Sequence, residues 1–258
     1  MAVPDYDAFL KELYACKLCV DERRRFAVPT PDGKPRRGWN KFRTSSAANA
    51  PYKFPPIGFG QRPLLFIAIN PRFTDNVRIH DEVMSSLQSF TAFSQNRVFG
   101  GQYIRPESRA ANEPRERFYD DQLRIASATF PNQPFEDVAC SAEMYFCATA
   151  DADGLFCHNS PCAKQYLRQL IDAYVKPQVI VTFGNQIPQF FKKNISGVGA
   201  SVIHLPFRSS WSVTNIETMD SAVEWATRAV DALFTGAHVP PRNWTWPSSH
   251  VPQPVEKY

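Results

Sequence analysis

Pro63-Leu-Leu-Phe-Ile-Ala-Ile69, followed directly by Asn70-Pro71, is the stretch of sequence that decides the fold class. An unbroken apolar run of this length is typical of a strand buried on both faces, as strands are in parallel sheets. The run stops at an Asn-Pro pair, which is typical of a turn. We therefore expect a central, parallel strand with a polar turn at its carboxyl end.

Strand and helix patterns alternate along the rest of the chain. We expect further strands at residues 135–146, 178–183 and 200–204. Helices are expected at residues 6–14, 161–174, 186–193 and 218–233, from apolar residues at helical spacing or from a capping residue before a proline. The alternation predicts an α/β fold over residues 1–258, a single-domain three-layer α/β/α sandwich with a central, mainly parallel sheet.

Candidate site residues follow from this architecture, because open α/β sheets bind ligands at the carboxyl ends of their strands. Asn70, Glu143 and His204 lie at or near the ends of the expected strands. Each also has a plainer interpretation. An Asn-Pro pair often only ends a strand. Glu143 is equally typical of a surface glutamate, and a lone histidine is usually a core residue bonded to backbone.

Composition limits the partners and the compartment. The net charge of +4 comes from 29 basic and 25 acidic residues, so charge gives an anionic partner such as DNA only weak support. No apolar run approaches the about 20 residues of a membrane span, and the first residues carry no export leader. We expect a cytoplasmic monomer without a membrane partner, whose six cysteines stay reduced as metal ligands or buried side chains.

Two segments differ in composition from the rest of the expected domain. Residues 23–60 form a basic, loop-rich segment, and residues 237–258 form a tail rich in proline and tryptophan. We expect the first segment to be an ordered loop on the core or a surface that faces DNA. The tail is expected to run over the surface after the last helix.

Four motifs occur in one order along the chain. They are Ile69-Asn70-Pro71, Arg97-Val-Phe99-Gly-Gly101, the pair Cys162-Ala-Lys-Gln-Tyr-Leu-Arg-Gln-Leu and Lys176-Pro-Gln-Val-Ile-Val-Thr-Phe-Gly184, and His204-Leu-Pro206-Phe-Arg-Ser209. Together they resemble the uracil-DNA glycosylase superfamily, in particular its iron-sulfur branch, families four and five. The chain departs from the family pattern where Ala68 and Arg72 replace two glycines and where Leu205 is inserted.

The resemblance implies a role for each site residue. Asn70 would position the attacking water and His204 would donate to the base oxygen, while Phe99, one of 20 phenylalanines, would stack on the flipped base. The turn residues Ile69, Pro71 and Arg72 would also contact the substrate, and Pro206, Phe207 and Arg208 would wedge the DNA. Glu143 stands where the family usually has an asparagine that reads the base edge.

The resemblance also implies a cofactor. Cys16, Cys19, Cys147 and Cys162 would bind a structural 4Fe-4S cluster, with Cys140 and Cys157 as bystanders. Four thiolates suit a structural zinc equally well, so the cysteines alone leave zinc as the alternative.

These residues together predict a monofunctional DNA glycosylase. An ionised Glu143 has no donor for uracil O4 but accepts from the amino group of cytosine, so we favour a modified cytosine, as in phage DNA attacked by an antiviral defence. One alternative is an ordinary uracil-DNA glycosylase in base excision repair. Another is a catalytically weak DNA-binding module of the same fold, and a third is a zinc-stabilised nucleic-acid protein without a base pocket.

Overall fold

The computed structural model describes residues 5–18, 44–45, 47–58, 60–68, 81–95, 117–144, 146–147, 163–184, 187–206, 213–244, 246 and 252–258. The chain divides into two units. Unit 1 comprises Met1–Ile57, Ala68–Asn96 and Ala142–Tyr174, and unit 2 comprises Gly58–Ile67, Arg97–Ser141 and Val175–Tyr258. The single domain expected over residues 1–258 stays a prediction.

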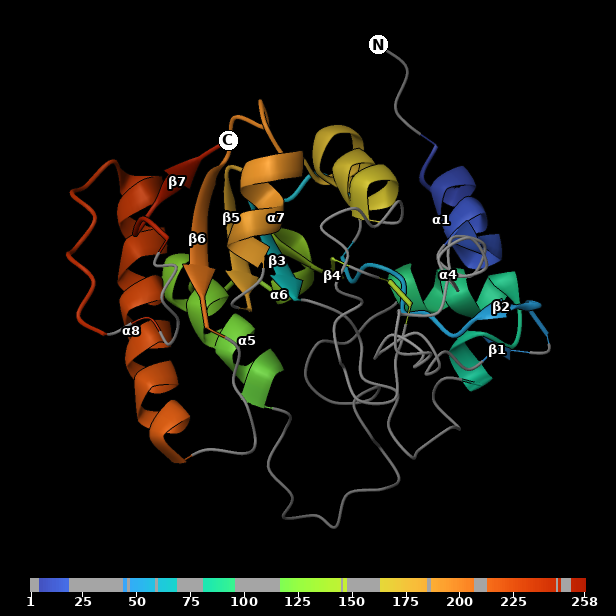
Figure 1. The fold of residues 1–258 in the computed structure, drawn as a ribbon, viewed down its shortest axis with the longest axis horizontal. Helices are drawn as coiled ribbons and strands as arrows, with labels where there is room; N and C mark the ends of the chain where they lie inside the picture. Colours follow the sequence, from blue (N-terminus) through green and yellow to red (C-terminus); the bar gives the residue numbers. More distant parts are fainter. Residues whose placement is uncertain are drawn as a thin grey trace, which may run out of the picture. The chain divides into compact units, whose positions relative to one another are not determined.

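A five-stranded sheet forms the centre of unit 2, in the order β4-β3-β5-β6-β7 (Figure 1). The strands are β3 (Leu64–Ala68), β4 (Ala139–Glu143), β5 (Val179–Phe183), β6 (Ser201–Leu205) and β7 (Glu256–Lys257). β5 and β6 run parallel with Thr182 opposite His204, and β7 runs antiparallel to β6. The fold is therefore a mixed α/β fold with a mainly parallel sheet, as the sequence predicts.

Alternation of side chains along the strands explains how helices cover both faces of this sheet. On one face, Phe66, Val181 and Ile203 pack into a core with helices α5 (Arg117–Thr129), α6 (Phe135–Val138) and α8 (Val213–Thr235). His204 faces the other way, where Phe191 of helix α7 (Ile187–Asn194) meets its ring edge-on at 6.0 Å. Helices thus lie on both sides of the sheet, which is the layering of an α/β sandwich.

Helix α8 has 23 residues and is amphipathic. Ala222, Val223 and Ala226 are buried in the core, whereas Glu224 and Asp231 are exposed. Among the described residues, no helix is both long and apolar enough to cross a membrane.

Unit 1 is built around helix α1 (Tyr6–Ala15), which begins at Asp5, whose side chain accepts a hydrogen bond from the backbone of Ala8 at 3.1 Å. The Phe9 ring meets that of Tyr166, 5.9 Å away. Tyr166 lies in the helical segment that contains η1 (Ala163–Leu167) and η2 (Leu170–Val175). Unit 1 also contains helix α4 (Leu87–Gln95) and a two-stranded hairpin, β1 (Thr44–Ser45) with β2 (Ala50–Pro51).

The structure corrects one predicted strand and adds elements. Residues 135–146 are not one strand, because Phe135–Val138 forms the short helix α6 before β4 begins at Ala139. Glu136 and Asp137 lie in the first turn of α6, where the helix dipole favours acidic side chains. Helices α4 and α5 and strand β7 are also present without having been predicted. The described part of residues 23–60, positions 44–45, 47–58 and 60, includes the hairpin as well as loop.

Candidate functional site

The carboxyl ends of β3 and β4 meet at the position where the sequence predicts an active site. The backbone N–H of Met144, directly after β4, donates to the carbonyl of Ala68, the last residue of β3, at 2.7 Å. Glu143, the last residue of β4, is half-buried. The structure thus places Glu143 beside the strand end from which the chain continues toward Asn70.

Most of the other predicted site residues lie outside the described residues. They are Ile69, Asn70, Pro71, Arg72, Phe99, Phe207 and Arg208. Pro206 is described, and it lies buried directly after β6. The roles of all these residues stay predictions.

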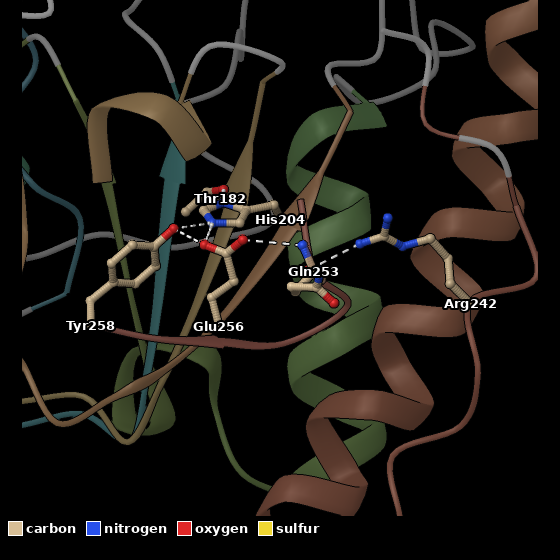
Figure 2. A network of polar contacts seen from close by, with 6 residues as sticks. All are labelled: Thr182, His204, Arg242, Gln253, Glu256 and Tyr258. Atoms are coloured by element: carbon tan, nitrogen blue, oxygen red, sulfur yellow. Dashed lines mark hydrogen bonds and ion pairs between the residues drawn. The ribbon is translucent and has the colours of Figure 1, made fainter. Parts of the chain in front are cut away.

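His204 lies inside β6 rather than after it, because the strand continues to Leu205. Its side chain is fully buried. Figure 2 shows the ring close to Thr182 and Tyr258. Nδ1 lies 2.7 Å from the Thr182 hydroxyl, and Nε2 lies 3.2 Å from the Tyr258 hydroxyl. Both ring nitrogens therefore have hydrogen-bond partners within unit 2.

The direction of these hydrogen bonds follows from the charges. Burial lowers the pKa of His204, which favours the neutral ring. The neighbouring His204 ring, whose Nε2 lies 3.7 Å from Glu256 Oε2, is the main reason why the pKa of Glu256 falls to about 2, so Glu256 is a carboxylate that accepts from the Tyr258 hydroxyl. Because the Tyr258 hydroxyl donates its hydrogen to Glu256, its oxygen accepts from Nε2–H of His204. Nδ1 of His204 in turn accepts from the Thr182 hydroxyl. Each donor in this hydrogen-bond network thus has an acceptor.

The C-terminal segment extends this network toward α8 (Figure 2). The backbone N–H of Gln253 donates to Glu256 Oε1 at 3.1 Å, and Arg242 Nη2 donates to the Gln253 carbonyl at 3.1 Å. The Arg242 guanidinium lies 4.8 Å from the centre of the Trp244 ring, within cation–π distance. The predicted surface tail is thus partly integrated into unit 2.

This geometry is that of a buried core histidine, although the ring bonds side chains and not the backbone that the plainer interpretation expected. To donate to a departing base, Nε2 must first release Tyr258. The catalytic role of His204 stays a prediction. Sequence reasoning missed Thr182, Glu256 and Tyr258 as its neighbours, because Thr182 lies 22 residues and Tyr258 lies 54 residues from His204 in the sequence.

Two of the four predicted metal ligands are described, and both are buried cysteines of unit 1. Cys16 follows α1, and Cys147 forms an antiparallel backbone bridge with Lys53. The chemistry of this pair fits a metal that binds thiolates. Cys19 and Cys162 lie outside the described residues, and within those residues no group of three His, Cys, Asp or Glu side chains is placed to hold a metal.

Cys140 belongs to a different part of the molecule. It lies in β4 within unit 2, and its thiol donates to the carbonyl of Gly58 at 3.5 Å. Gly58 has a φ of +102°, and a Cβ there would lie 2.5 Å from the Ala139 carbonyl oxygen, so only glycine fits against β4. Cys140 is thus buried against Gly58 in unit 2, and its expected place as a bystander to the cofactor stays a prediction.

No protein-family model matches the chain, and no curated protein sequence matches it. The resemblance to the uracil-DNA glycosylase superfamily therefore rests on the four motifs quoted above.

Proposed function

We propose that the protein is a monofunctional DNA glycosylase that hydrolyses the N-glycosidic bond of a base flipped out of DNA, with a modified cytosine as the favoured target. The observation that carries the proposal is the position of Glu143 at the carboxyl end of β4, beside the end of β3. Ligand sites of open α/β sheets form at such strand ends. The proposed setting is the cytoplasm, where the protein acts on DNA as a monomer.

To hydrolyse an N-glycosidic bond, the protein must orient the base and the attacking water and stabilise the charges that develop as the bond breaks. A base inside the duplex is out of reach, so it must be extruded and held between an aromatic face and groups that read its edge. As the bond breaks, positive charge develops on the sugar and negative charge on the base. In the proposed mechanism Phe99 stacks on the base, Asn70 orients the water and His204 donates to the base oxygen.

The proposed role of Glu143 concerns which base is accepted. A carboxylate accepts hydrogen bonds but cannot donate, so it pairs with the amino group of cytosine and repels uracil O4. An unmatched polar pair in a dry pocket costs about 1–3 kcal/mol, which corresponds to about 10- to 100-fold in rate. This difference supports an amino-bearing base, as in the modified cytosines of phage DNA, over uracil and over an ordinary role in repair.

The proposed cofactor is a 4Fe-4S cluster bound by Cys16, Cys19, Cys147 and Cys162, with structural zinc as the alternative. Bound there, it would cross-link the amino-terminal segment to the segments of Cys147 and Cys162, and it would supply no redox step.

A second candidate function is a DNA-binding module that does not cut. One specific observation favours it: both ring nitrogens of His204 have hydrogen-bond partners inside unit 2. Release of a free base from DNA separates the two functions.

The test compares excision of uracil, cytosine and 5-substituted cytosines by the wild type and by Glu143→Gln, scored as abasic sites. The substitution exchanges one carboxylate oxygen for an amide donor at unchanged length. We expect the wild type to prefer a 5-substituted cytosine and the variant to lose about 10- to 100-fold on it while gaining on uracil. Glu224→Gln on the exposed side of α8 is the control and should behave as the wild type. Efficient uracil excision by the wild type, unchanged in Glu143→Gln, would overturn the proposed specificity.

A further inference from the structure

Residues 252–258 are attached to the sheet of unit 2 by a strand of only two residues. β7 is the edge strand, and its two register pairs join it to the first two residues of β6. The carbonyl of Tyr258 also accepts hydrogen bonds from the backbone of Val198, at 2.8 Å, and of Gly199, at 3.2 Å. Among the seven described residues of this segment, only Pro252 is buried. Short edge elements with few buried side chains are the parts of a protein that open at the lowest free energy.

This segment covers a ring that is itself fully buried. His204 has none of its surface exposed, although β6 lies next to the edge strand. Its Nε2 lies 3.2 Å from the Tyr258 hydroxyl and 3.7 Å from Glu256 Oε2. Figure 2 shows both of these side chains pointing toward the ring. Residues 252–258 are therefore held in part by the ring that they cover, and their detachment would expose that ring to water.

The protonation state of His204 decides how well this arrangement is satisfied. In the neutral ring, Nε2–H donates to Tyr258 and Nδ1 accepts from Thr182. A second proton can bind only at Nδ1, and Nδ1–H then meets the Thr182 oxygen, so the hydroxyl hydrogen of Thr182 loses its acceptor. The protonated ring is also a buried charge without water around it. Protonation therefore destabilises the attached segment in two ways.

The charged groups around the ring do not reverse this effect. Among the described residues, the Glu256 carboxylate favours a protonated ring and Arg242 opposes it. The Tyr258 hydroxyl keeps its proton, because burial and the Glu256 carboxylate raise its pKa. Thr182 of β5 and Phe191 of α7, which contact the ring from the other elements, are uncharged. Burial outweighs the attraction of Glu256, so the pKa of the ring falls below its ordinary value.

We propose that residues 252–258 form a latch that closes over neutral His204 and opens when His204 takes up a proton. In the open latch the charged ring is hydrated, and Nε2 has lost its contact with Tyr258. Nε2 is the atom that the proposed mechanism assigns to the base, so the latch controls whether that atom is available. The inference itself requires no glycosylase activity, because it concerns only the attachment of the latch to β6.

Hydrogen exchange of backbone amides in the full-length protein, compared between about pH 7.5 and about pH 5.5, tests the latch. Two amides report its opening, that of Gln253, bonded to Glu256, and that of Gly199, bonded to the Tyr258 carbonyl. Each rate is divided by the intrinsic exchange rate at the same pH. We expect the protection of both amides to fall about tenfold at the lower pH, the effect of taking up one proton with an ordinary pKa of 6.5 in the open state. Both amides should also exchange faster than that of Val181 in β5, which reports opening of the sheet.

Three variants assign the effect to the ring. His204→Gln keeps a donor and an acceptor but takes up no proton, so the protection of its latch should be equal at both pH values. His238→Gln, at an exposed position, is the matched control and should keep the wild-type difference. Tyr258→Phe keeps the contact with Phe191 and removes the hydroxyl, so its latch should be about tenfold less protected at both pH values. Protection of the Val181 amide shows whether each variant is folded.

The wild type alone can overturn the inference, whichever variants fold. It is wrong if the latch amides exchange only together with that of Val181, or if their protection is equal at both pH values. A pH difference that persists in folded His204→Gln would assign the proton to another group and would also overturn it. Base excision enters none of these readouts, so the proposed function can fail while this inference stands.

Discussion

Lys53 and His204 are two fully buried basic side chains that the protein accommodates in opposite ways. His204 lies between Thr182 of β5 and the C-terminal segment, and both of its ring nitrogens have described hydrogen-bond partners there. Burial lowers the pKa of the ring, which favours its neutral form. The Lys53 ammonium group donates to the carbonyls of Tyr14, two residues before Cys16, and of Pro51, and the backbone of Lys53 forms a bridge with that of Cys147. A neutral ring needs only matched hydrogen bonds, whereas an ammonium group also needs a nearby negative charge. The hydrogen bonds of His204 therefore join β5, β6 and the C-terminal segment, whereas the two described for Lys53 join segments of unit 1.

The largest expected effect is the loss of metal from a variant in the cysteine region of unit 1, compared with a matched variant in unit 2. Cys147→Ser removes a predicted ligand and should abolish metal binding, because serine is not a thiolate donor. Cys140→Ser is the matched control, since Cys140 is equally buried but bonds the Gly58 carbonyl in unit 2. Metal analysis and the visible spectrum of the two purified variants make the comparison. Full metal content in Cys147→Ser, or its loss in Cys140→Ser alone, would show that the ligands are misassigned.

A smaller effect is expected in the His204 network. Thr182→Val keeps the shape of the side chain but removes the hydroxyl that donates to Nδ1, and an unsatisfied buried acceptor costs about 1–3 kcal/mol. The melting temperature should fall by several degrees, and metal content should stay unchanged. Thr227→Val, in which the lost hydroxyl bonds a carbonyl within α8 in a half-buried position, serves as control and should cost less. An unchanged melting temperature in Thr182→Val would mean that this network contributes nothing to stability.

The smallest effect is the pH dependence of stability. Because the pKa of His204 is lowered in the folded protein, the unfolded chain takes up a proton near its ordinary value of 6.5 while the folded state stays neutral. The contribution of neutral His204 to stability is therefore fully present above that value and is lost as the pH falls below it. The free energy of unfolding should decrease by about 1 kcal/mol between about pH 7.5 and about pH 5.5. The Glu256 carboxylate, with a pKa of about 2, stays ionised across this window.

Melting temperatures across this pH range test the assignment. His204→Gln should flatten the slope, whereas His238→Gln, at an exposed position, should leave it as in the wild type. A slope that persists in His204→Gln would assign the pH dependence to other groups.

The sequence was a good guide wherever one residue pattern determines one element. The apolar runs at residues 63–69 and 178–183 correspond to β3 and β5, because a strand buried on both faces needs no polar residues. Helices α4 and α5 were missed, in a stretch of the chain for which no element was predicted. β7 was missed because two residues, Glu256 and Lys257, carry no periodicity.

The candidate site was less predictable, because its properties arise from residues far apart in sequence. Position near a strand end correctly placed Glu143 at the carboxyl end of β4. It could not show that Tyr258 lies against His204, since that contact depends on β7 pairing with β6. The burial of Lys53 was also not predictable, because a single lysine in a loop-rich segment is normally solvated.

The central claim is that the protein breaks an N-glycosidic bond, and mass spectrometry of the small products tests it most directly. DNA carrying one 5-substituted cytosine is incubated with excess wild-type protein, and both the released molecules and the strand are identified. The account predicts the free modified base and an uncleaved strand with one abasic site, and neither product with Asn70→Ala. DNA that is bound but releases no base, or that yields nucleotides, would contradict the account.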